Sequence, residues 1–230
     1  MPEKQTIRQV NEIEYTLIRK SVKNINLRVY EDGRIIVSAN SKVTLKRIDG
    51  FVKDNMDKII AFCGKLEERS CYRLIPREFK SGEEFYFMGE KRVISLSKNS
   101  SVFLEGKTLY IPETNIEKLF TKWLREQAKT VLTEYVDRVY SEFKNYNVPY
   151  PQISIRPMKT QWGSCRPNAG KISLNLYLLA TPPECIYYVV VHEFSHFLHP
   201  NHSIYFWNVV AQFVPDYKEK RKEMKKYSSL

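Results

Sequence analysis

The chain has 230 residues, of which 43% are hydrophobic and 27% are charged, and these proportions exclude a disordered or collagen-like protein. No apolar run follows the charged first residues, and no apolar segment is long enough to cross a bilayer. We therefore expect a cytoplasmic protein with neither a signal peptide nor a membrane partner. The net charge of +11 suits attraction to nucleic acid, to an anionic surface or to an acidic substrate, or else a solvated basic surface, and charge alone does not decide between them.

The first half of the chain is expected to be rich in strands. Alternating apolar and polar residues predict strands at 13–18, 25–29 and 35–38, with a turn at 31–33 before the last. Apolar residues at helical spacing then predict a helix over 43–68. From Tyr72 to Pro112 the pattern returns to strands separated by glycine and asparagine turns.

The second half is expected to be mainly helical. A long amphipathic helix is predicted over 116–143, followed by a strand at 153–155 and a β-hairpin over 162–176. The pattern indicates an α+β protein with a β-rich part at 1–112 and a helical part at 113–230, joined in one compact unit. We detect no internal repeat.

The four histidines fall within eleven residues, at His192, His196, His199 and His202. The segment from His192 to His196 has the pattern HExxH. In a helix, residues i and i+4 share a face, so His192 and His196 can bind one zinc ion. Glu193 lies about 100° further around the helix, where its carboxylate can act as general base on a zinc-activated water without being a ligand.

The signals for helix ends support this placement. Thr181-Pro-Pro-Glu184 resembles a capping box with proline at the first helical position, and Pro200 forbids smooth continuation. A second helix is predicted from Ser203 to Val214, and Asp216 with Glu219 forms a capping box for a charged last helix. The residues expected to face inward in the second helix are Ile204, Trp207, Val210, Ala211 and Val214.

The third ligand is expected to be His202. His199 lies about 10.5 Å along the helix axis from His192, too far for both to bind one ion unless the helix breaks. His202 follows the turn at Pro200-Asn201, where the chain can fold back. The spacing matches a metzincin, but His199 replaces the metzincin glycine, which argues against a metzincin proper. Two roles remain for His199: it supports the ligands, or it is an exposed residue at a helix end.

A structural zinc site is the alternative use of these histidines. Such sites have four ligands and usually contain cysteine, whereas three histidines leave a position open for catalysis. The cysteines are scattered without a CxxC pair and are expected to be reduced thiols. They are Cys63, Cys71, Cys165 and Cys185.

Several motifs together closely resemble the YgjP-like metallopeptidase family, small zincins related to the SprT-like and WLM proteases. The matching segments are Trp162–Cys165, Lys171–Asn175, Pro182–Pro183, Tyr188–Glu193, His199–His202, Phe206–Trp207 and Pro215–Lys218. The resemblance implies a minimal zincin fold, with His192, His196 and His202 as ligands and Glu193 as catalytic base. The SprT-like and WLM relatives suggest, by analogy only, proteolysis of DNA-bound proteins.

Candidates for contacts with the substrate or its oxyanion are Tyr205, Arg166 and Asn175. The strand 172–176 can pair with an extended peptide if it lies at a sheet edge, or it is an internal strand. Trp162 is expected to anchor the core more readily than to contact substrate.

Two functions follow from these patterns. The first is a zinc-dependent peptidase acting on a peptide or protein. The second is a basic, zinc-containing adaptor that associates with nucleic acid and has little turnover. The glutamate of HExxH favours the first, because a scaffold has no need of a general base.

Overall fold

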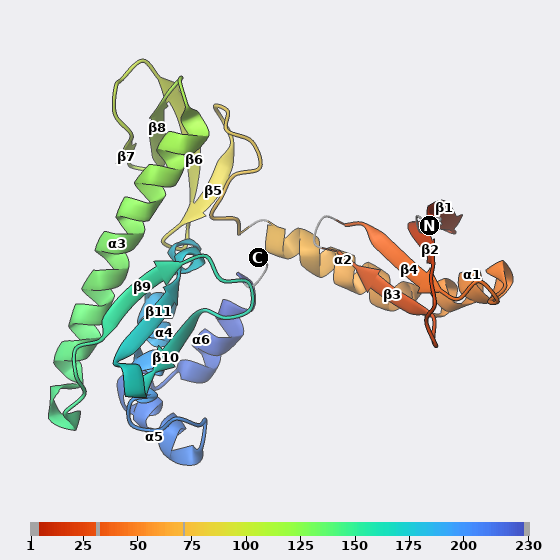
Figure 1. Ribbon diagram of the computed structural model, residues 1–230. Helices are drawn as coiled ribbons and strands as arrows, with labels where there is room; N and C mark the ends of the chain where they lie inside the picture. Colours follow the sequence, from red (N-terminus) through yellow and green to blue (C-terminus); the bar gives the residue numbers. More distant parts are fainter. Residues whose placement is uncertain (1–4, 31–32, 71, 228–230) are drawn as a thin grey trace. The chain divides into compact units, whose positions relative to one another are not determined.

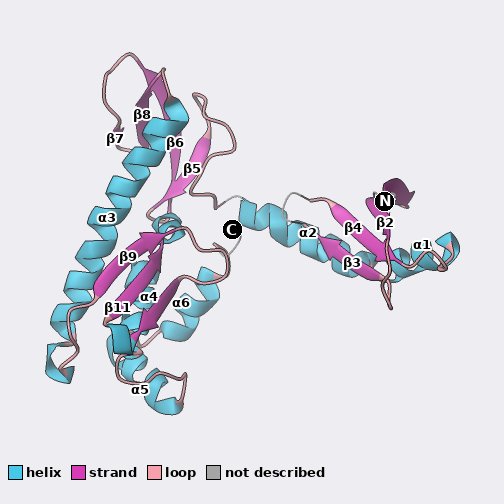
Figure 2. Cartoon of the chain, in the orientation of Figure 1, coloured by secondary structure: helices cyan, strands magenta, loops and turns pink. Residues whose placement is uncertain are grey.

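The computed structural model describes residues 5–30, 33–70 and 72–227 of the chain. The described residues form two compact units, one that ends at residue 70 and one that begins at residue 72, and each has its own hydrophobic core. Both units combine strands with helices (Figures 1 and 2), so the predicted α+β class is confirmed. The charged first residues 1–4, the turn residues Glu31 and Asp32, and Cys71 lie outside the described part.

The first unit is a four-stranded sheet with two helices. The strand order is β1-β2-β4-β3, and only the central pair β2 and β4 is parallel. Residues from both helices join the strands in one core, including Ile48 of α1 and Ile59 of α2. The elements are β1 (Gln5–Val10), β2 (Ile13–Arg19), β3 (Asn26–Val29), β4 (Ile35–Ala39), α1 (Leu45–Asp54) and α2 (Met56–Ser70).

The single helix expected over 43–68 is two helices, because Asn55 ends the first. The side-chain amide of Asn55 donates to the carbonyl of Phe51 at 2.9 Å, and its backbone N–H caps α1. At the other end, Thr44 accepts a hydrogen bond from the backbone N–H of Arg47. Strand β1 was not expected, and it pairs along its length with β2.

An ion pair joins the strands of the first unit to α1. Arg8 of β1 donates to the Asp49 carboxylate at 2.7 Å, and the Tyr15 hydroxyl of β2 donates to the same carboxylate at 2.6 Å. These bonds hold the pKa of Asp49 below its ordinary value, chiefly through the hydrogen bond from Arg8. Asp49 is therefore a point where β1, β2 and α1 are joined.

The second unit contains two sheets that share one core. Its long helix α3 packs against strands of both sheets and against α4 (Figure 1). The sheet orders are β5-β6-β8-β7 and β10-β11-β9. The strands are β5 (Glu84–Phe87), β6 (Glu90–Ser97), β7 (Phe103–Glu105), β8 (Thr108–Pro112), β9 (Gln152–Arg156), β10 (Gly163–Arg166) and β11 (Lys171–Asn175), and the helices are α3 (Ile116–Glu142), α4 (Pro183–Ser195), α5 (Ile204–Phe213) and α6 (Tyr217–Met224).

The boundary between the units differs from the one expected at 112/113. It lies after residue 71 because strands β5, β6 and β8 bury their apolar side chains against α3. Leu109 and Ile111 of β8 belong to the same core as Phe120 and Leu124 of α3. Cutting the chain at 112 would divide this core.

The sheet β5-β6-β8-β7 repeats the topology of the first unit. In both, the two central strands are parallel, the outer pairs are antiparallel, and a helix follows the fourth strand. Gly33 and Gly106 occupy equivalent hairpin turns with φ of 83° and 54°, where glycine adopts the left-handed conformation without strain. The sequence analysis did not detect this repeat in topology.

Two predicted capping boxes do not form. The Thr181 hydroxyl donates to the carbonyl of Leu178 at 2.8 Å, so it closes the preceding 3-10 helix, and Pro182 is the N-cap of α4. The Asp216 side chain makes no capping bond and instead lies 3.4 Å from the Lys220 ammonium. In both cases the side chain that the motif predicts to cap the helix interacts with a different partner.

Candidate metal centre

Helix α4 carries the HExxH residues through the middle of the second unit. Its apolar residues are buried nearly all round, including Ile186, Val190 and Phe194. The helix ends at Ser195 with His196 as C-cap, and a backbone bond from His199 to the Ser195 carbonyl closes the last turn at 3.0 Å. The chain then turns back into α5.

The turn brings His202 back to the pair on α4. The Nε2 atoms of His202 and His192 lie 3.0 Å apart, and one nitrogen from each of His192, His196 and His202 lies within 4.8 Å of the others. The three rings enclose a single point, with centroids 4.8–5.0 Å apart. Three imidazole nitrogens at such distances suit one divalent ion and leave a coordination position open.

His199 takes a different position from the other three histidines. Its backbone carbonyl lies 3.2 Å from Nδ1 of His196, which leaves Nε2 of His196 facing the cluster. Its own ring lies near Tyr205, with centroids 6.1 Å apart. The backbone of His199 therefore orients a neighbouring imidazole, as supports of metal ligands do, while its side chain points elsewhere.

Helix α5 packs an aromatic side chain against all three clustered rings. The Phe206 ring is fully buried and lies 4.6–4.8 Å from the ring centroids of His192, His196 and His202. In the same helix Val209 and Val210 are buried, whereas Ile204 is 70% exposed. The prediction that Ile204 faces inward was wrong, because Phe206 sets the buried face and Ile204 lies about 200° away from it.

Burial makes His192 and His196 suitable ligands. It is the main reason that the pKa of His192 falls to about 3, and the neighbouring His196 adds to the effect. Burial also lowers the pKa of His196. Neutral imidazole is the form that binds a metal ion. The Nδ1 atom of His192 is buried without a hydrogen-bond partner among the described residues.

Glu193 is buried beside the histidines and faces strand β10. It is 4% exposed, and burial raises its pKa to about 8. Its Oε2 atom has no hydrogen-bond partner among the described atoms. A Cβ atom added to Gly163 would lie only 2.5 Å from Oε1 of Glu193, so the strand passes directly over the carboxylate.

A cleft with a volume of about 710 Å³ opens above the histidines and Glu193. Its walls come from the segment around β10, from α4 and from α6, and both β10 and α6 pack against α4. Beyond the three histidines and Glu193, the lining residues are Gln161, Trp162, Gly163, Ser164, Cys165, Pro167, Tyr188, Val189, Pro200, Arg221, Met224 and Lys225.

None of the three expected substrate contacts is among these lining residues. Arg166 is exposed at the end of β10, and Tyr205 is 66% exposed. Asn175 is 2% exposed, and its amide bonds to the backbone of Met158, Gln161 and Tyr177. Trp162 both packs against the core and lines the cleft.

The sheet order decides which strand borders the cleft. Strand β11 lies between β9 and β10, so of the two alternatives for 172–176 the internal strand is the correct one. Strand β10 pairs with β11 alone among the described strands. The predicted hairpin of β10 and β11 is confirmed.

Helix α6 supplies cleft residues that the sequence analysis missed. Arg221, Met224 and Lys225 line the cleft, although this segment was expected only to be a charged helix. A signal was present, because Met224 is the one apolar residue in a run of charges and marks the buried face of α6.

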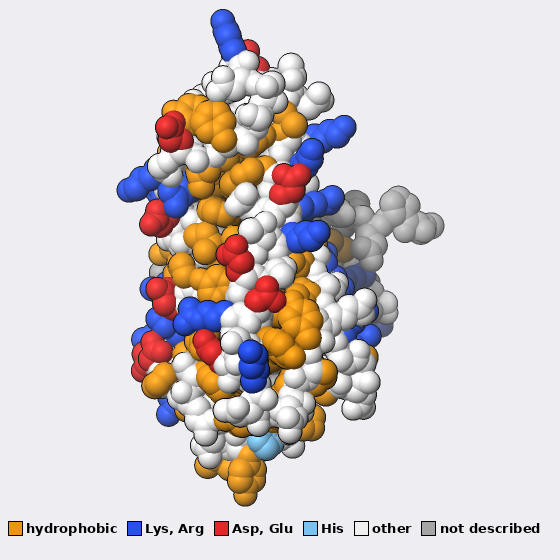
Figure 3. Space-filling model, turned by 90° about the vertical axis from the view of Figure 1, so that its left-hand side faces the viewer, with side chains coloured by type: hydrophobic (Ala, Val, Ile, Leu, Met, Phe, Trp, Pro, Cys, Tyr) orange, Lys and Arg blue, Asp and Glu red, His pale blue; other side chains and the backbone are white. Residues whose placement is uncertain are grey.

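The structure bears on two further expectations, nucleic-acid binding through the basic charge and the absence of a membrane-spanning helix. On the face shown in Figure 3, acidic and basic side chains are interspersed among apolar ones, so no area of one sign marks a nucleic-acid site there. No described helix is both long and apolar enough to cross a bilayer.

One of three comparisons with known proteins identifies a family. No curated protein matches the chain significantly. Among solved structures, the metallopeptidase zymogens jannalysin of Methanocaldococcus jannaschii and abylysin of Pyrococcus abyssi each share 24% identity over 40% of this chain. The matches cover 92% and 90% of those chains, with TM-scores of 0.36 and 0.37. The model of the YgjP-like metallopeptidase domain matches residues 23–227. The chain therefore belongs to the YgjP-like metallopeptidase family.

Proposed function

We propose that this chain is a zinc peptidase in which His192, His196 and His202 bind the ion and Glu193 is the general base. The observation that carries the proposal is the meeting of three imidazole nitrogens within 4.8 Å of one another at the floor of a cleft that also contains a buried carboxylate. Membership of a metallopeptidase family supports a peptide or protein substrate.

The donor set fits zinc. Neutral imidazoles are borderline ligands that suit zinc, copper or nickel better than magnesium or calcium, which prefer oxygen. When bound, zinc polarises the peptide carbonyl and lowers the pKa of a water molecule toward about 7. The described residues provide three nitrogens and no cysteine in the cluster, which is the composition of an open catalytic site rather than a closed structural one.

Glu193 has the position and environment of a proton carrier. Its carboxylate faces the cleft under Gly163, and burial raises its pKa to about 8, so it holds a proton more readily than an exposed glutamate does. It takes a proton from the attacking water and passes the proton to the leaving amine. During both proton transfers the Glu193 side chain stays on the face of α4 next to His192.

Strand β10 provides a backbone edge on which a peptide can lie. Because β10 pairs with β11 alone among the described strands, its outer edge is available for an extended substrate to add as a further strand. Gly163 to Cys165 line the cleft, so this pairing would carry the scissile bond over Glu193. The pairing gives affinity through the backbone and therefore tolerates many substrate sequences.

The test is cleavage of a chemically unfolded protein by the zinc-loaded chain. We expect slow, zinc-dependent fragmentation that a chelator abolishes and that added zinc restores. Wild-type protein that contains about one zinc per chain and cleaves no unfolded protein or peptide would contradict the proposal.

A further inference from the structure

The lining of the cleft includes a cation that has no carboxylate partner among the described residues. Arg221 of α6 lines the cleft, and among the described residues none forms an ion pair with it. Its neighbour Lys220, in contrast, lies 3.4 Å from the Asp216 carboxylate. The two adjacent cations of α6 thus have different partners, and only Arg221 faces the site.

An aromatic stack holds Arg221 beside the histidine cluster. The guanidinium carbon lies 5.4 Å from the centroid of the Trp207 ring, a cation–π distance. Trp207 stacks on Tyr217 at 4.9 Å and on His202 at 5.6 Å. Trp207 therefore orients the guanidinium through its ring face, and the N–H donors of Arg221 bond to no described side chain, so they are available for a ligand.

The charges that line the cleft favour an anionic partner. Glu193 is the only carboxylate among the described lining residues, and it is 4% exposed. Arg221 and Lys225 are the cationic side chains of the lining, and a bound divalent ion would add positive charge. An acidic group that enters the cleft is attracted by these positive charges, and no exposed carboxylate of the lining repels it.

We propose that Arg221 binds a carboxylate of the substrate, so that the cleft selects peptides with an Asp or Glu side chain close to the scissile bond. The planar guanidinium suits a carboxylate because two N–H groups can donate to its two oxygens. This inference rests on the proposed peptidase function and specifies its substrate class.

The experiment compares blocked decapeptides in pairs. In each pair a single Glu, moved through the central positions, is replaced by Gln in the twin, so that shape is kept and only charge changes. A further pair without Glu has a free or an amidated C-terminus, which separates a side-chain carboxylate from a terminal one. Dissociation constants are measured in zinc-loaded Glu193→Gln protein, which binds without cleaving, and kcat/KM is measured in the otherwise native chain.

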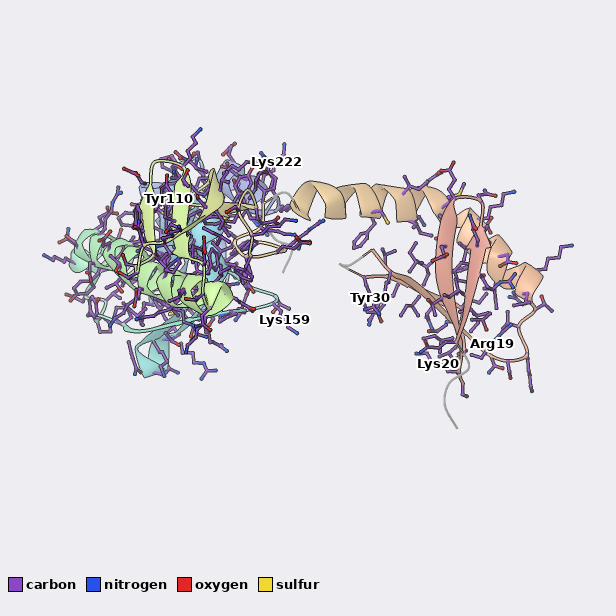
Figure 4. All side chains as sticks on the ribbon, turned by 90° about the horizontal axis from the view of Figure 1, so that it is seen from above. Arg19, Lys20, Tyr30, Tyr110, Lys159 and Lys222 are labelled. Carbon is purple, nitrogen blue, oxygen red and sulfur yellow. The ribbon has the colours of Figure 1, made fainter. Side chains whose placement is uncertain are left out.

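Four proteins form the comparison, each in both backgrounds. They are the chain without further change, Arg221→Ala, Arg221→Glu and Lys222→Ala. Lys222 is the matched control, because it is the next residue of α6, carries the same charge and is exposed (Figure 4), and it does not line the cleft. Zinc content and thermal unfolding show that each variant is folded.

With Arg221 present, at least one Glu peptide should bind about tenfold more tightly than its Gln twin, as a charge-assisted hydrogen bond predicts. Arg221→Ala should reduce this ratio to about one, Arg221→Glu should invert it in favour of the Gln twin, and Lys222→Ala should preserve it. The ratio should also shrink as salt is raised.

Three results would overturn the inference. The first is equal binding of every Glu and Gln twin. The second is a preference for only the free C-terminus, which would assign Arg221 to a terminal carboxylate. The third is an equal loss of kcat on all peptides in Arg221→Ala with an unchanged charge ratio, which would assign Arg221 to the oxyanion. A clear binding preference without cleavage by the native chain would contradict the peptidase proposal instead.

Discussion

Gly163 of β10 and Glu193 of α4 approach each other so closely that no side chain fits between them. A Cβ atom on Gly163 would lie 2.5 Å from Oε1 and 2.7 Å from Cδ of Glu193. Because these distances are shorter than any ordinary contact, the Glu193 carboxylate can keep its place against β10 only with glycine at position 163. The pair links the edge strand of the small sheet directly to the proposed general base.

Gly163→Ala should therefore impair catalysis more than folding. The added methyl group must displace either the Glu193 carboxylate or strand β10, and a displacement of about 1 Å at a reacting group can cost about 10²-fold in rate. We expect kcat/KM on an unfolded substrate to fall by about that factor with zinc content unchanged.

Gly50→Ala is the matched control for this change. Gly50 lies in α1, and a Cβ atom there meets nothing within 4 Å. Alanine should stabilise the first unit by about 0.5–1 kcal/mol and leave cleavage unchanged. If Gly163→Ala keeps full activity, the close approach to Glu193 has no bearing on the reaction.

The third zinc ligand can be identified by comparing two histidines. His202→Ala removes a nitrogen that lies 3.0 Å from Nε2 of His192, so we expect zinc to be lost on dialysis. His199→Ala keeps the backbone carbonyl that lies 3.2 Å from His196 Nδ1, so zinc should be retained. Metal content per chain, measured by elemental analysis, decides the matter. The opposite pattern would assign the third ligand to His199.

Phe206 is expected to support zinc affinity by packing the ligands. Its ring contacts all three histidine rings at 4.6–4.8 Å. Phe206→Leu loosens this packing, and we expect zinc to bind about 10–100-fold more weakly, the loss typical of residues that position ligands. Competition with a fluorescent chelator measures it.

Phe213→Leu serves as its control in the same helix. Phe213 stacks on Phe143 at 4.4 Å, so its replacement should lower the free energy of unfolding with little change in zinc affinity. Equal zinc affinities in both variants would show that Phe206 contributes only to the core.

Much of the site was predictable because it depends on local spacing. The HExxH pattern and the turn at Pro200 place His192, His196 and His202 within one short segment, and no distant pairing is needed to bring them together. The β10–β11 hairpin was predictable for the same reason, since its turn and its alternation lie within 162–176.

The features that were missed depend on contacts between distant segments. The division after residue 71 rests on β8 packing against α3, and Arg221 reaches the cleft only because α6 packs against α4. The capping boxes failed because Thr181 and Asp216 bond to Leu178 and Lys220 instead. A sequence motif indicates which bonds a side chain can form, but it does not indicate which partner the side chain binds in the fold.

The first unit should depend on the charge of Asp49. Its pKa lies below the ordinary value of 3.8, mainly because of the hydrogen bond from Arg8 and also because of the one from Tyr15. The stability that Asp49 contributes is thus complete above pH ~4 and is lost as the pH falls through the lower folded-state pKa. Asp49→Asn should remove about 1–3 kcal/mol at pH 7.

Hydrogen exchange of amides in β1, β2 and α1 measures the stability of the first unit. Tryptophan fluorescence does not report on this unit, because the tryptophans of the chain all lie in 123–207. The difference between wild type and Asp49→Asn should be largest near neutral pH and should shrink below pH ~4. A difference that stays constant from pH 7 to pH 2.5 would mean that Asp49 stabilises the unit by its shape and not by its charge.

The most direct test of the proposed function is the zinc content and activity of Glu193→Gln. Glutamine keeps the size of the side chain and one oxygen, but it cannot accept a proton from the attacking water. Because Glu193 lies beside the three histidines without belonging to the group that meets within 4.8 Å, we expect about one zinc per chain to be retained. Cleavage of an unfolded protein should fall by ~10²–10⁴-fold. Loss of zinc together with activity would make Glu193 a ligand or a structural support, and unchanged cleavage by the zinc-loaded variant would contradict its role as general base.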